Sequence, residues 1–351
     1  MSAPHLSPSA VQRAKAFRTP GGPSIDDLTF DDVEVQPPGP GQVSVAIKAV
    51  SLNFRDLAVV TGRYPRRVSG PTVIASDGCG EVVSVGDAVT AFKPGDRVAG
   101  SFFQTWITGP FAREYGSSAL GGAIDGVLTQ QRVFDQAGLL RVPEHLSYEE
   151  GATLPCAGLT AWNALVPTAH VEAGDTVLLL GTGGVSIFGL QFAKLHGARV
   201  IITSSSDEKL ERARALGADE TINYKKNPEW EKEVLRLTGS NGVDMVLEVG
   251  GAETFPRSMS SVRASGQIVV IGVLSGVAGT VPLGLIGLQT LSVRGVYVGS
   301  VAMFEDMNRA IALHKLRPVI DRVFSFEETR EALRYLQSAR HFGKVVISIE
   351  K

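Results

Sequence analysis

The hydrophobic pattern changes character about halfway along the chain. In the first half, short segments such as residues 43–48 and 80–86 alternate apolar and polar positions, and turn residues such as those at 36–41 separate them. This pattern predicts an antiparallel, barrel-like domain, interrupted by one helix at residues 53–61. In the second half, unbroken apolar runs alternate with helix-length segments. That alternation predicts a doubly wound parallel sheet.

The predicted fold class is therefore α/β, a Rossmann sheet plus a β-rich domain. A capping box at residues 147–150 starts a helix near the boundary between the domains. A closing helix at residues 327–338 leads to a last strand that could return to the first domain. We assign residues 1–152 to the β-rich domain, 153–315 to the Rossmann domain and 316–351 to the return. The expected parallel strands lie at residues 176–180, 199–203, 220–224, 243–249, 267–273 and 292–298, with helices near 229–237, 253–262 and 303–313.

A glycine-rich loop follows the first parallel strand and is the strongest candidate for binding chemistry. It contains Gly181, Thr182, Gly183, Gly184 and Val185. The first glycine allows a tight turn, and the second lets the backbone approach a pyrophosphate, which amide N–H groups and the N-terminus of the next helix would bind. A serine at position 186 takes the usual third glycine position, where it is small enough for close packing. Because the loop lies between a strand and a helix, it predicts a dinucleotide site.

The end of the second parallel strand bears on which dinucleotide is bound. NAD sites place an acid about 20 residues past the first glycine, where it binds the ribose 2′-hydroxyl. This chain has Ser204, Ser205 and Lys209 there, and hydroxyls with a cation suit a 2′-phosphate. The pattern favours NADP(H) over NAD(H), although Asp207 and Glu208 lie nearby. The alternative is that the serines form only a loop and a cap, with Ser205 and Glu208 making a capping box.

Composition narrows the functional class. The chain has 351 residues, enough for two domains, and is 44% hydrophobic and 20% charged, which is typical of a soluble globular protein. Its net charge of -2 does not favour nucleic acid or an acidic membrane surface. Two cysteines exclude a disulfide scaffold and fit a reducing cytoplasm. No apolar stretch approaches the roughly 18 residues of a membrane helix. We expect a cytoplasmic protein with a small-molecule substrate.

Several segments together resemble the medium-chain dehydrogenase/reductase superfamily. They are VSLNFRDL at residues 50–57, GDRV at 95–98, LPCAGLTAW at 154–162, ALGAD at 215–219 and FGKVV at 342–346, together with the Gly181 loop. The resemblance covers almost the whole chain. It implies that the β-rich domain is GroES-like and that the Rossmann domain binds a nicotinamide cofactor.

The superfamily divides by metal, so the ligand positions are informative. The zinc alcohol dehydrogenases carry Cys where this chain has Asn53, His where it has Ser76 and Glu where it has Asp77. Only Cys156 matches a ligand, and one thiolate cannot make the three-ligand site of a catalytic zinc. The four-cysteine structural zinc lobe is replaced by the Gly-rich segment at residues 106–126. We therefore predict no zinc.

The resemblance to zinc-independent relatives, the quinone oxidoreductases and the enoyl reductase modules of polyketide synthases, implies an NADPH-dependent reducer of a quinone, enone or related carbonyl. It places Asn53 beside the nicotinamide ribose and the substrate, and Thr160 on the nicotinamide side. It also places Ser204, Lys209 and Tyr224 at the 2′-phosphate. The remaining expected cofactor contacts are Gly250, Gly272, Val273, Phe342 and Lys344. The alternatives are an NAD(P)-dependent alcohol or aldehyde dehydrogenase and a non-catalytic NADPH-binding protein.

The position that carries a possible proton donor in the relatives differs in this chain. Many quinone oxidoreductases have a tyrosine where this chain has Ala58. Tyr64 is the nearest alternative donor, so we name it with Asn53 as a catalytic candidate. It could equally be a half-buried aromatic residue without a catalytic role, with water supplying the proton.

Residues 290–298 form an apolar run at the end of the predicted sheet. An apolar sheet edge in water templates pairing with other chains, so we expect a homodimer in which the edge pairs with its own copy across a two-fold axis. The alternative is that the apolar loop at residues 281–289 covers the edge within one subunit. In the first case, proline in place of Val296 should remove a ladder donor and favour the monomer.

Overall fold

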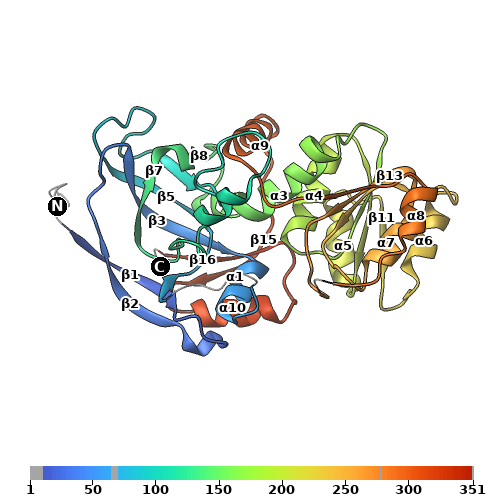
Figure 1. Ribbon diagram of the computed structural model, residues 1–351, viewed down its shortest axis with the longest axis horizontal. Helices are drawn as coiled ribbons and strands as arrows, with labels where there is room; N and C mark the ends of the chain where they lie inside the picture. Colours follow the sequence, from blue (N-terminus) through green and yellow to red (C-terminus); the bar gives the residue numbers. More distant parts are fainter. Residues whose placement is uncertain (1–10, 65–69, 277, 350–351) are drawn as a thin grey trace. The chain divides into compact units, whose positions relative to one another are not determined.

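The computed structural model describes residues 11–64, 70–276 and 278–349, and they form two compact units. The first contains the chain up to Cys156 together with the chain from Gly299 onward, and the second runs from Ala157 to Val298. Figure 1 shows the elements of each unit in the colours of the sequence. Helix α9 (Val301–His314), which we expected to close the Rossmann domain, lies in the first unit. None of the helices in the described ranges is long and apolar enough to cross a membrane.

The first unit is built on a large sheet whose strand order is β15-β16-β3-β5-β6-β8, with β7 also paired to β3. A smaller sheet has the order β2-β1-β4. The predicted strand at residues 43–48 lies in β3, and the one at residues 80–86 extends one residue past the end of β5. The last strand does return, because β16 pairs antiparallel with β3. The strands are β1 (Gln12–Thr19), β2 (Thr29–Val35), β3 (Gln42–Leu52), β4 (Thr72–Val73), β5 (Asp77–Val85), β6 (Arg97–Gly100), β7 (Gln131–Asp135), β8 (Leu139–Arg141), β15 (Ile320–Ser325) and β16 (Lys344–Ser348).

Helices pack on this sheet near the predicted positions. Helix α1 (Phe54–Val60) follows Asn53, and α10 (Thr329–Gln337) is the predicted closing helix. The capping box of α2 (Tyr148–Ala152) is confirmed: Ser147 Oγ accepts the backbone N–H of Glu150, and Glu150 accepts that of Ser147.

The helix that we expected to continue beyond Ala152 is interrupted. Wider π-turns at Leu154–Gly158 and Ala164–Thr168 flank a short α-helix, α3 (Leu159–Asn163). Each π-turn contains a proline, at positions 155 and 167. Proline has no backbone N–H to donate, which accounts for the break.

The second unit contains a six-stranded sheet in which every neighbouring pair is parallel, with the order β11-β10-β9-β12-β13-β14. The predicted doubly wound sheet is thus confirmed. From β9 the chain adds β10 and β11 on one side of the sheet, and it then returns to add β12, β13 and β14 on the other side. In such sheets, ligands bind at the carboxyl ends of the strands where the order changes direction, which here is the switch point between β9 and β12. The strands are β9 (Thr176–Leu179), β10 (Arg199–Ser204), β11 (Glu220–Asn223), β12 (Val243–Glu248), β13 (Val262–Val270) and β14 (Ser292–Gly295).

Buried side chains of β9, β10, β12 and β13, such as Leu178 and Ile268, form the core of this unit. The helices around it are α4 (Gly184–Leu195), α5 (Asp207–Ala215), α6 (Trp230–Leu237), α7 (Phe255–Ser261) and α8 (Leu283–Leu288). Our expectation of a loop at residues 281–289 was wrong, because this segment contains α8. Its sequence LGLIGL has no polar face and contains two glycines, so it lacks the helical period that sequence analysis needs.

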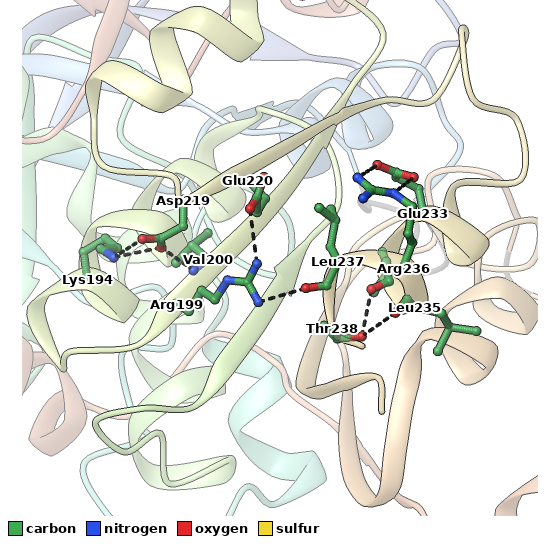
Figure 2. A network of polar contacts seen from close by, with 11 residues as sticks. Lys194, Arg199, Val200, Asp219, Glu220, Glu233, Leu235, Arg236, Leu237 and Thr238 are labelled. Carbon is green, nitrogen blue, oxygen red and sulfur yellow. Dashed lines mark hydrogen bonds and ion pairs between the residues drawn. The ribbon is translucent and has the colours of Figure 1, made fainter. Parts of the chain in front are cut away.

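A network of ion pairs joins α4, β10, β11 and α6 (Figure 2). Lys194 pairs with Asp219 at 2.8 Å, while Arg199 donates to Glu220 at 3.2 Å and to the carbonyl of Leu237 at 3.1 Å. Arg199 and Glu220 are the first residues of their strands, so the network lies at the amino ends of the sheet. It is therefore at the opposite end from the expected ligand site and contributes to stability only modestly.

Candidate functional site

The glycine loop has the geometry of an anion site. Gly181, just after β9, has a φ of +72°, a left-handed conformation that glycine adopts without strain. Helix α4 begins at Gly184, and its N-cap Gly183 supplies no side-chain cap. A Cβ added to Gly181 or Gly183 would meet no atom within 4 Å. The N–H groups of the first turn, through Val185, can therefore bind a phosphate without interference from side chains.

Two further residues set how closely α4 approaches the sheet. Ser186 is buried and its hydroxyl donates to the carbonyl of Leu180 at 2.7 Å, as a small residue at this position should allow. The closest approach is one turn later. A Cβ on Gly189 would lie 3.1 Å from Leu179 and 3.2 Å from Leu247. Sequence analysis missed Gly189, although its spacing from the loop could have suggested it.

A buried carboxylate organises the neighbouring turn at the switch point. Glu248, the last residue of β12, accepts the backbone N–H groups of Gly250 at 2.7 Å and Gly251 at 2.9 Å. It also accepts the hydroxyls of Thr254 at 2.7 Å and Ser258 at 2.5 Å. The turn that carries Gly250, a predicted cofactor contact, is therefore fixed by one side chain. The signal in the sequence was an acid at the end of an apolar strand, followed closely by two glycines.

The turn around Gly250 lies against the predicted contacts after β13. A Cβ on Gly251 would lie 2.8 Å from the Cα of Val273, and a Cβ on Gly272 would lie 2.3 Å from the carbonyl oxygen of Val249. The structure thus brings Gly250, Gly272 and Val273 together at the carboxyl end of the sheet. Val273 is 47% exposed, so its side chain is accessible to a ligand of this unit.

The end of β10 carries the predicted phosphate-binding residues. Ser204 is buried, and its hydroxyl accepts the backbone N–H of Ser206 at 3.4 Å, so it is less available than expected. Ser205 and Lys209 are half-buried, and Tyr224 is 39% exposed.

The capping box of Ser205 and Glu208, which was the alternative to phosphate binding, does not form. Ser206 caps α5 by accepting the N–H of Lys209. The helix begins one residue later than expected, so its third residue is a lysine and cannot return the hydrogen bond. Asp207 pairs with Lys226 at 2.6 Å and accepts from Asn223 at 2.7 Å, and the bond from Lys226 lowers the pKa of Asp207.

In the first unit, strand register assembles a buried polar cluster. Strands β16 and β3 pair with Val345 opposite Leu52, which brings Lys344 next to Asn53. The Lys344 Nζ donates to Asn53 Oδ1 at 2.5 Å and to the carbonyl of Leu52 at 2.8 Å. Asp56 Oδ2 accepts the backbone N–H of Asn53 at 2.8 Å.

Asp77 completes this cluster and accepts two hydrogen bonds. Its donors are the Ser76 hydroxyl at 2.6 Å and the backbone N–H of Cys156 at 3.0 Å. Burial raises the pKa of Asp77 to about 6, opposed by the charge of Lys344, and burial also raises the pKa of Asp56. For Lys344, burial lowers the pKa, while the charge of Asp77 raises it. The four groups are thus two acids, one cation and one amide, all nearly closed to solvent.

Arg55 and Tyr64 lie at the edge of the cluster. The Arg55 guanidinium is 3.5 Å from Asp56, 5.3 Å from the Tyr64 ring centroid and 4.8 Å from that of Phe102. Tyr64 is half-buried, and its ring packs against the Arg55 guanidinium. Phe342, a predicted cofactor contact, is 1% exposed, and Thr160 is buried on α3 of the second unit. The structure therefore brings together Asn53 and Lys344 among the predicted site residues of the first unit.

The residues at the zinc-ligand positions do not fit a zinc ion. Asn53 Oδ1 is bonded to an ammonium group, Ser76 donates its hydroxyl proton to Asp77, and burial raises the pKa of the Cys156 thiol, which disfavours the thiolate. Across the described ranges, no group of three or more His, Cys, Asp or Glu side chains could hold a metal ion. The cation at this position is Lys344.

Two protein families match segments of this chain. Residues 39–144 match the alcohol dehydrogenase GroES-like domain family, and residues 184–314 match the zinc-binding dehydrogenase family. A zinc-type alcohol dehydrogenase-like protein of Schizosaccharomyces pombe is 44% identical over 334 residues, which cover 93% of this chain and 96% of the relative. The chain belongs to the medium-chain dehydrogenase/reductase superfamily. The predicted resemblance is confirmed. A quinone oxidoreductase of Pseudomonas aeruginosa is 32% identical and covers 94% of this chain and 98% of its own.

Solved structures of the superfamily share the fold. A Sinorhizobium meliloti protein assigned as an alcohol dehydrogenase has a TM-score of 0.90 and 42% identity, covering 96% of this chain and 99% of its own. An NAD-dependent alcohol dehydrogenase has a TM-score of 0.86 and 37% identity, covering 96% and 100%. The 2-octenoyl-CoA carboxylase reductase CinF, in complex with NADP and 2-octenoyl-CoA, has a TM-score of 0.87 and 25% identity, covering 96% and 87%. This medium-chain dehydrogenase/reductase is an oxidoreductase that uses a nicotinamide cofactor.

Proposed function

We propose that this medium-chain dehydrogenase/reductase is a zinc-independent, NADPH-dependent oxidoreductase that reduces a quinone, an enone or a related carbonyl compound. One observation carries the proposal: at the position of the zinc ligands, Lys344 is hydrogen-bonded to Asn53, while the second unit keeps an intact dinucleotide loop. Alcohol oxidation needs a group that stabilises an alkoxide, and the residues present do not supply the metal-ligand set that performs this task. Reduction of a polarised double bond needs only orientation and stabilisation of an oxyanion.

The second unit would hold the cofactor by residues of its own. Bound NADPH supplies the hydride. The N–H groups from Thr182 to Val185 would hold the pyrophosphate, while Gly181 turns the chain and donates its own N–H to Thr203 Oγ1 at 3.1 Å. The turn that Glu248 fixes would carry the contacts at Gly250, Gly272 and Val273. The proposed 2′-phosphate contacts are Ser205, Lys209 and Tyr224, with Ser204 supporting the turn from its buried position.

Cofactor choice rests on charge near the end of β10. Because Asp207 is paired with Lys226, this acid repels a 2′-phosphate less than a lone carboxylate would. That pairing, together with Lys209, supports NADPH. The NAD-dependent structural neighbour gives weight to NADH as the alternative cofactor.

A second candidate is an NAD(P)-dependent alcohol dehydrogenase, which the relatives described as alcohol dehydrogenases favour. Purified protein should be assayed for NADPH and NADH oxidation with quinones, enones and aldehydes, and for the reverse reaction with alcohols. We expect NADPH-dependent reduction of at least one quinone or enone. Alcohol oxidation without any reduction of these acceptors would contradict the proposal. Binding of NADPH without turnover on the whole panel would favour a non-catalytic role.

We also propose a homodimer formed through β14. The strand is the outer edge of its sheet, its residue Val293 is 38% exposed, and Leu283 and Leu288 of the nearby segment α8 are 73% and 87% exposed. An edge of this kind is suited to pairing with a second copy. The free thiols of Cys79 and Cys156 fit our expectation of a cytoplasmic location.

The substitution of Val296 that the sequence suggested is not a test of the dimer. The Val296 N–H donates to the carbonyl of Val270 within the same sheet, at 3.0 Å. Because N–H groups alternate in direction along a strand, the N–H of Val293 points to the open edge instead. A proline at that position removes an outward donor and leaves the pairing with β13 intact.

A further inference from the structure

The orientation of the Asn53 amide is determined by its neighbour. The Lys344 ammonium has three donors and no acceptor, so only the amide oxygen of Asn53 can face it, at 2.5 Å. The amide nitrogen must then point the other way.

The Asn53 Nδ2 group is a buried donor without a partner. Asn53 is 8% exposed, and its Nδ2 is shielded from solvent and makes no hydrogen bond of standard geometry within the protein. A hydrogen-bonding interaction with the Asn53 side chain is the smallest of the effects that act on the pKa of Asp77, so the Asp77 carboxylate lies near the amide, although Nδ2 and this carboxylate do not reach standard hydrogen-bond geometry. Buried donors without partners are rare in proteins and cost free energy. An acceptor on a bound molecule would remove that cost.

We propose that Lys344 takes the place of the metal as the organising cation of the site, and that it holds the Asn53 amide so that Nδ2 donates to a carbonyl oxygen of the substrate. This inference rests on the proposed reduction of a quinone or enone. When hydride supplied by bound NADPH is added to the electron-poor carbon, the carbon–carbon π pair would shift toward the carbonyl, and its oxygen would become an enolate or phenolate. Nδ2 donates to that oxygen, and a proton is added afterwards. Lys344 is a positioning residue that acts through Asn53.

The alternative role for Lys344 is direct attraction of the anion by its own charge. The two roles differ in a double-mutant cycle. If Lys344 acts through the amide, removing it should have no further effect once Asn53 is alanine, whereas a direct charge effect would remain.

The probe is 4-nitrophenolate, whose charged oxygen on a planar ring mimics the reduced substrate and whose absorbance reports binding. We expect Asn53→Ala to weaken its binding to the NADP-saturated enzyme by roughly 10- to 100-fold, as for loss of a hydrogen bond to a charged group. Lys344→Met should weaken it to a similar degree in the wild-type background and by less than about twofold in the Asn53→Ala background. Ser348→Ala, at the far end of β16, is the matched control. The Kd of NADPH, measured by fluorescence, shows whether any variant has lost the cofactor instead.

Additive losses for Asn53→Ala and Lys344→Met would overturn the inference, as would an Asn53→Ala variant that binds the probe normally. If Lys344→Met fails to fold, Lys344→Arg keeps the cation while changing its reach, and it should weaken probe binding only when Asn53 is present. Probe binding and turnover, measured separately, distinguish this inference from the proposed function. Coupled losses in probe binding with no reduction of any quinone or enone would leave this inference standing and refute the proposed function. If the wild-type enzyme reduces a quinone or enone but the losses of Asn53→Ala and Lys344→Met are additive, the proposed function stands and this inference is refuted.

Discussion

Glu248 gives the sharpest test of how the second unit holds its candidate cofactor site. Its carboxylate receives four hydrogen bonds, from the N–H groups of Gly250 and Gly251 and the hydroxyls of Thr254 and Ser258. Glu248→Ala would leave at least two of these donors, Gly251 N–H and the Ser258 hydroxyl, buried without a partner. Each unsatisfied donor costs about 1–3 kcal/mol. We therefore expect a loss of about 3–6 kcal/mol in the stability of this unit, including the cavity.

Glu248→Gln separates hydrogen bonding from charge. The glutamine oxygen can still accept from Gly250, Gly251 and Thr254, and the Ser258 hydroxyl can rotate to accept from the new amide. Only the charge assistance is lost, and the desolvation penalty of a buried carboxylate is lost with it. We expect a change below about 2 kcal/mol. NADPH binding should follow the same order, weakened more by alanine than by glutamine, because the turn carries Gly250.

The assay should be local, because a chain of two compact units does not have one well-defined unfolding energy. Hydrogen exchange of the peptide covering residues 248–262, followed by mass spectrometry, reports opening of the turn directly. Glu253→Gln, at an exposed position of the same turn, is the control and should change little. Equal protection in the alanine and glutamine variants, or a loss below about 1 kcal/mol in Glu248→Ala, would refute the reasoning.

Four further predictions follow from the site and the sheet edge. Lys209→Ala should weaken NADPH by about 1.5–3 kcal/mol while sparing NADH; titrations that show equal wild-type affinities for the two cofactors would contradict it. A strong chelator should leave activity intact, and one zinc per chain in elemental analysis would disprove metal independence. Asp77→Asn should alter the pH dependence of stability. Burial raises the pKa of Asp77 from 3.8 to about 6, so its protonated form favours folding, and the wild type should lose stability relative to the variant as pH rises through this window; parallel curves would count against it. Val293→Pro should shift the particle from twice the 37.2 kDa chain mass to one chain mass in light scattering, whereas a monomeric wild type would defeat the edge-pairing argument.

The parallel sheet and the glycine loop could be predicted because their signals are local. A strand buried on both faces is an apolar run, and the loop follows its strand directly. The helix at residues 283–288 could not be predicted, because an apolar segment with two glycines has no polar face to reveal its period. The cap of α5 was displaced by one residue, from Ser205 to Ser206, since three adjacent serines are chemically equivalent candidates.

The contacts of Glu248 and Lys344 could not be predicted from the sequence for a different reason. Lys344 meets Asn53 only because β16 pairs with β3 in one register, across 291 residues of sequence. A one-residue slip would turn its side chain to the other face of the sheet. The sequence indicated that the last strand returns to the first domain, but it did not indicate the register. The zinc-ligand positions could thus be found by resemblance, but only the structure shows that Lys344 lies among them.

The buried charges themselves support a functional interpretation of the cluster around Asn53. Placing Asp56, Asp77 and Lys344 out of solvent costs desolvation energy, as the raised pKa values of both acids show. Well-packed apolar residues of similar size are often as stabilising as buried ion pairs, or more so. Stability alone therefore does not account for the cluster. The cluster is accounted for if its task is to fix the direction of the Asn53 Nδ2 donor. A developing oxyanion is stabilised most by a dipole that does not need to reorient when the charge forms.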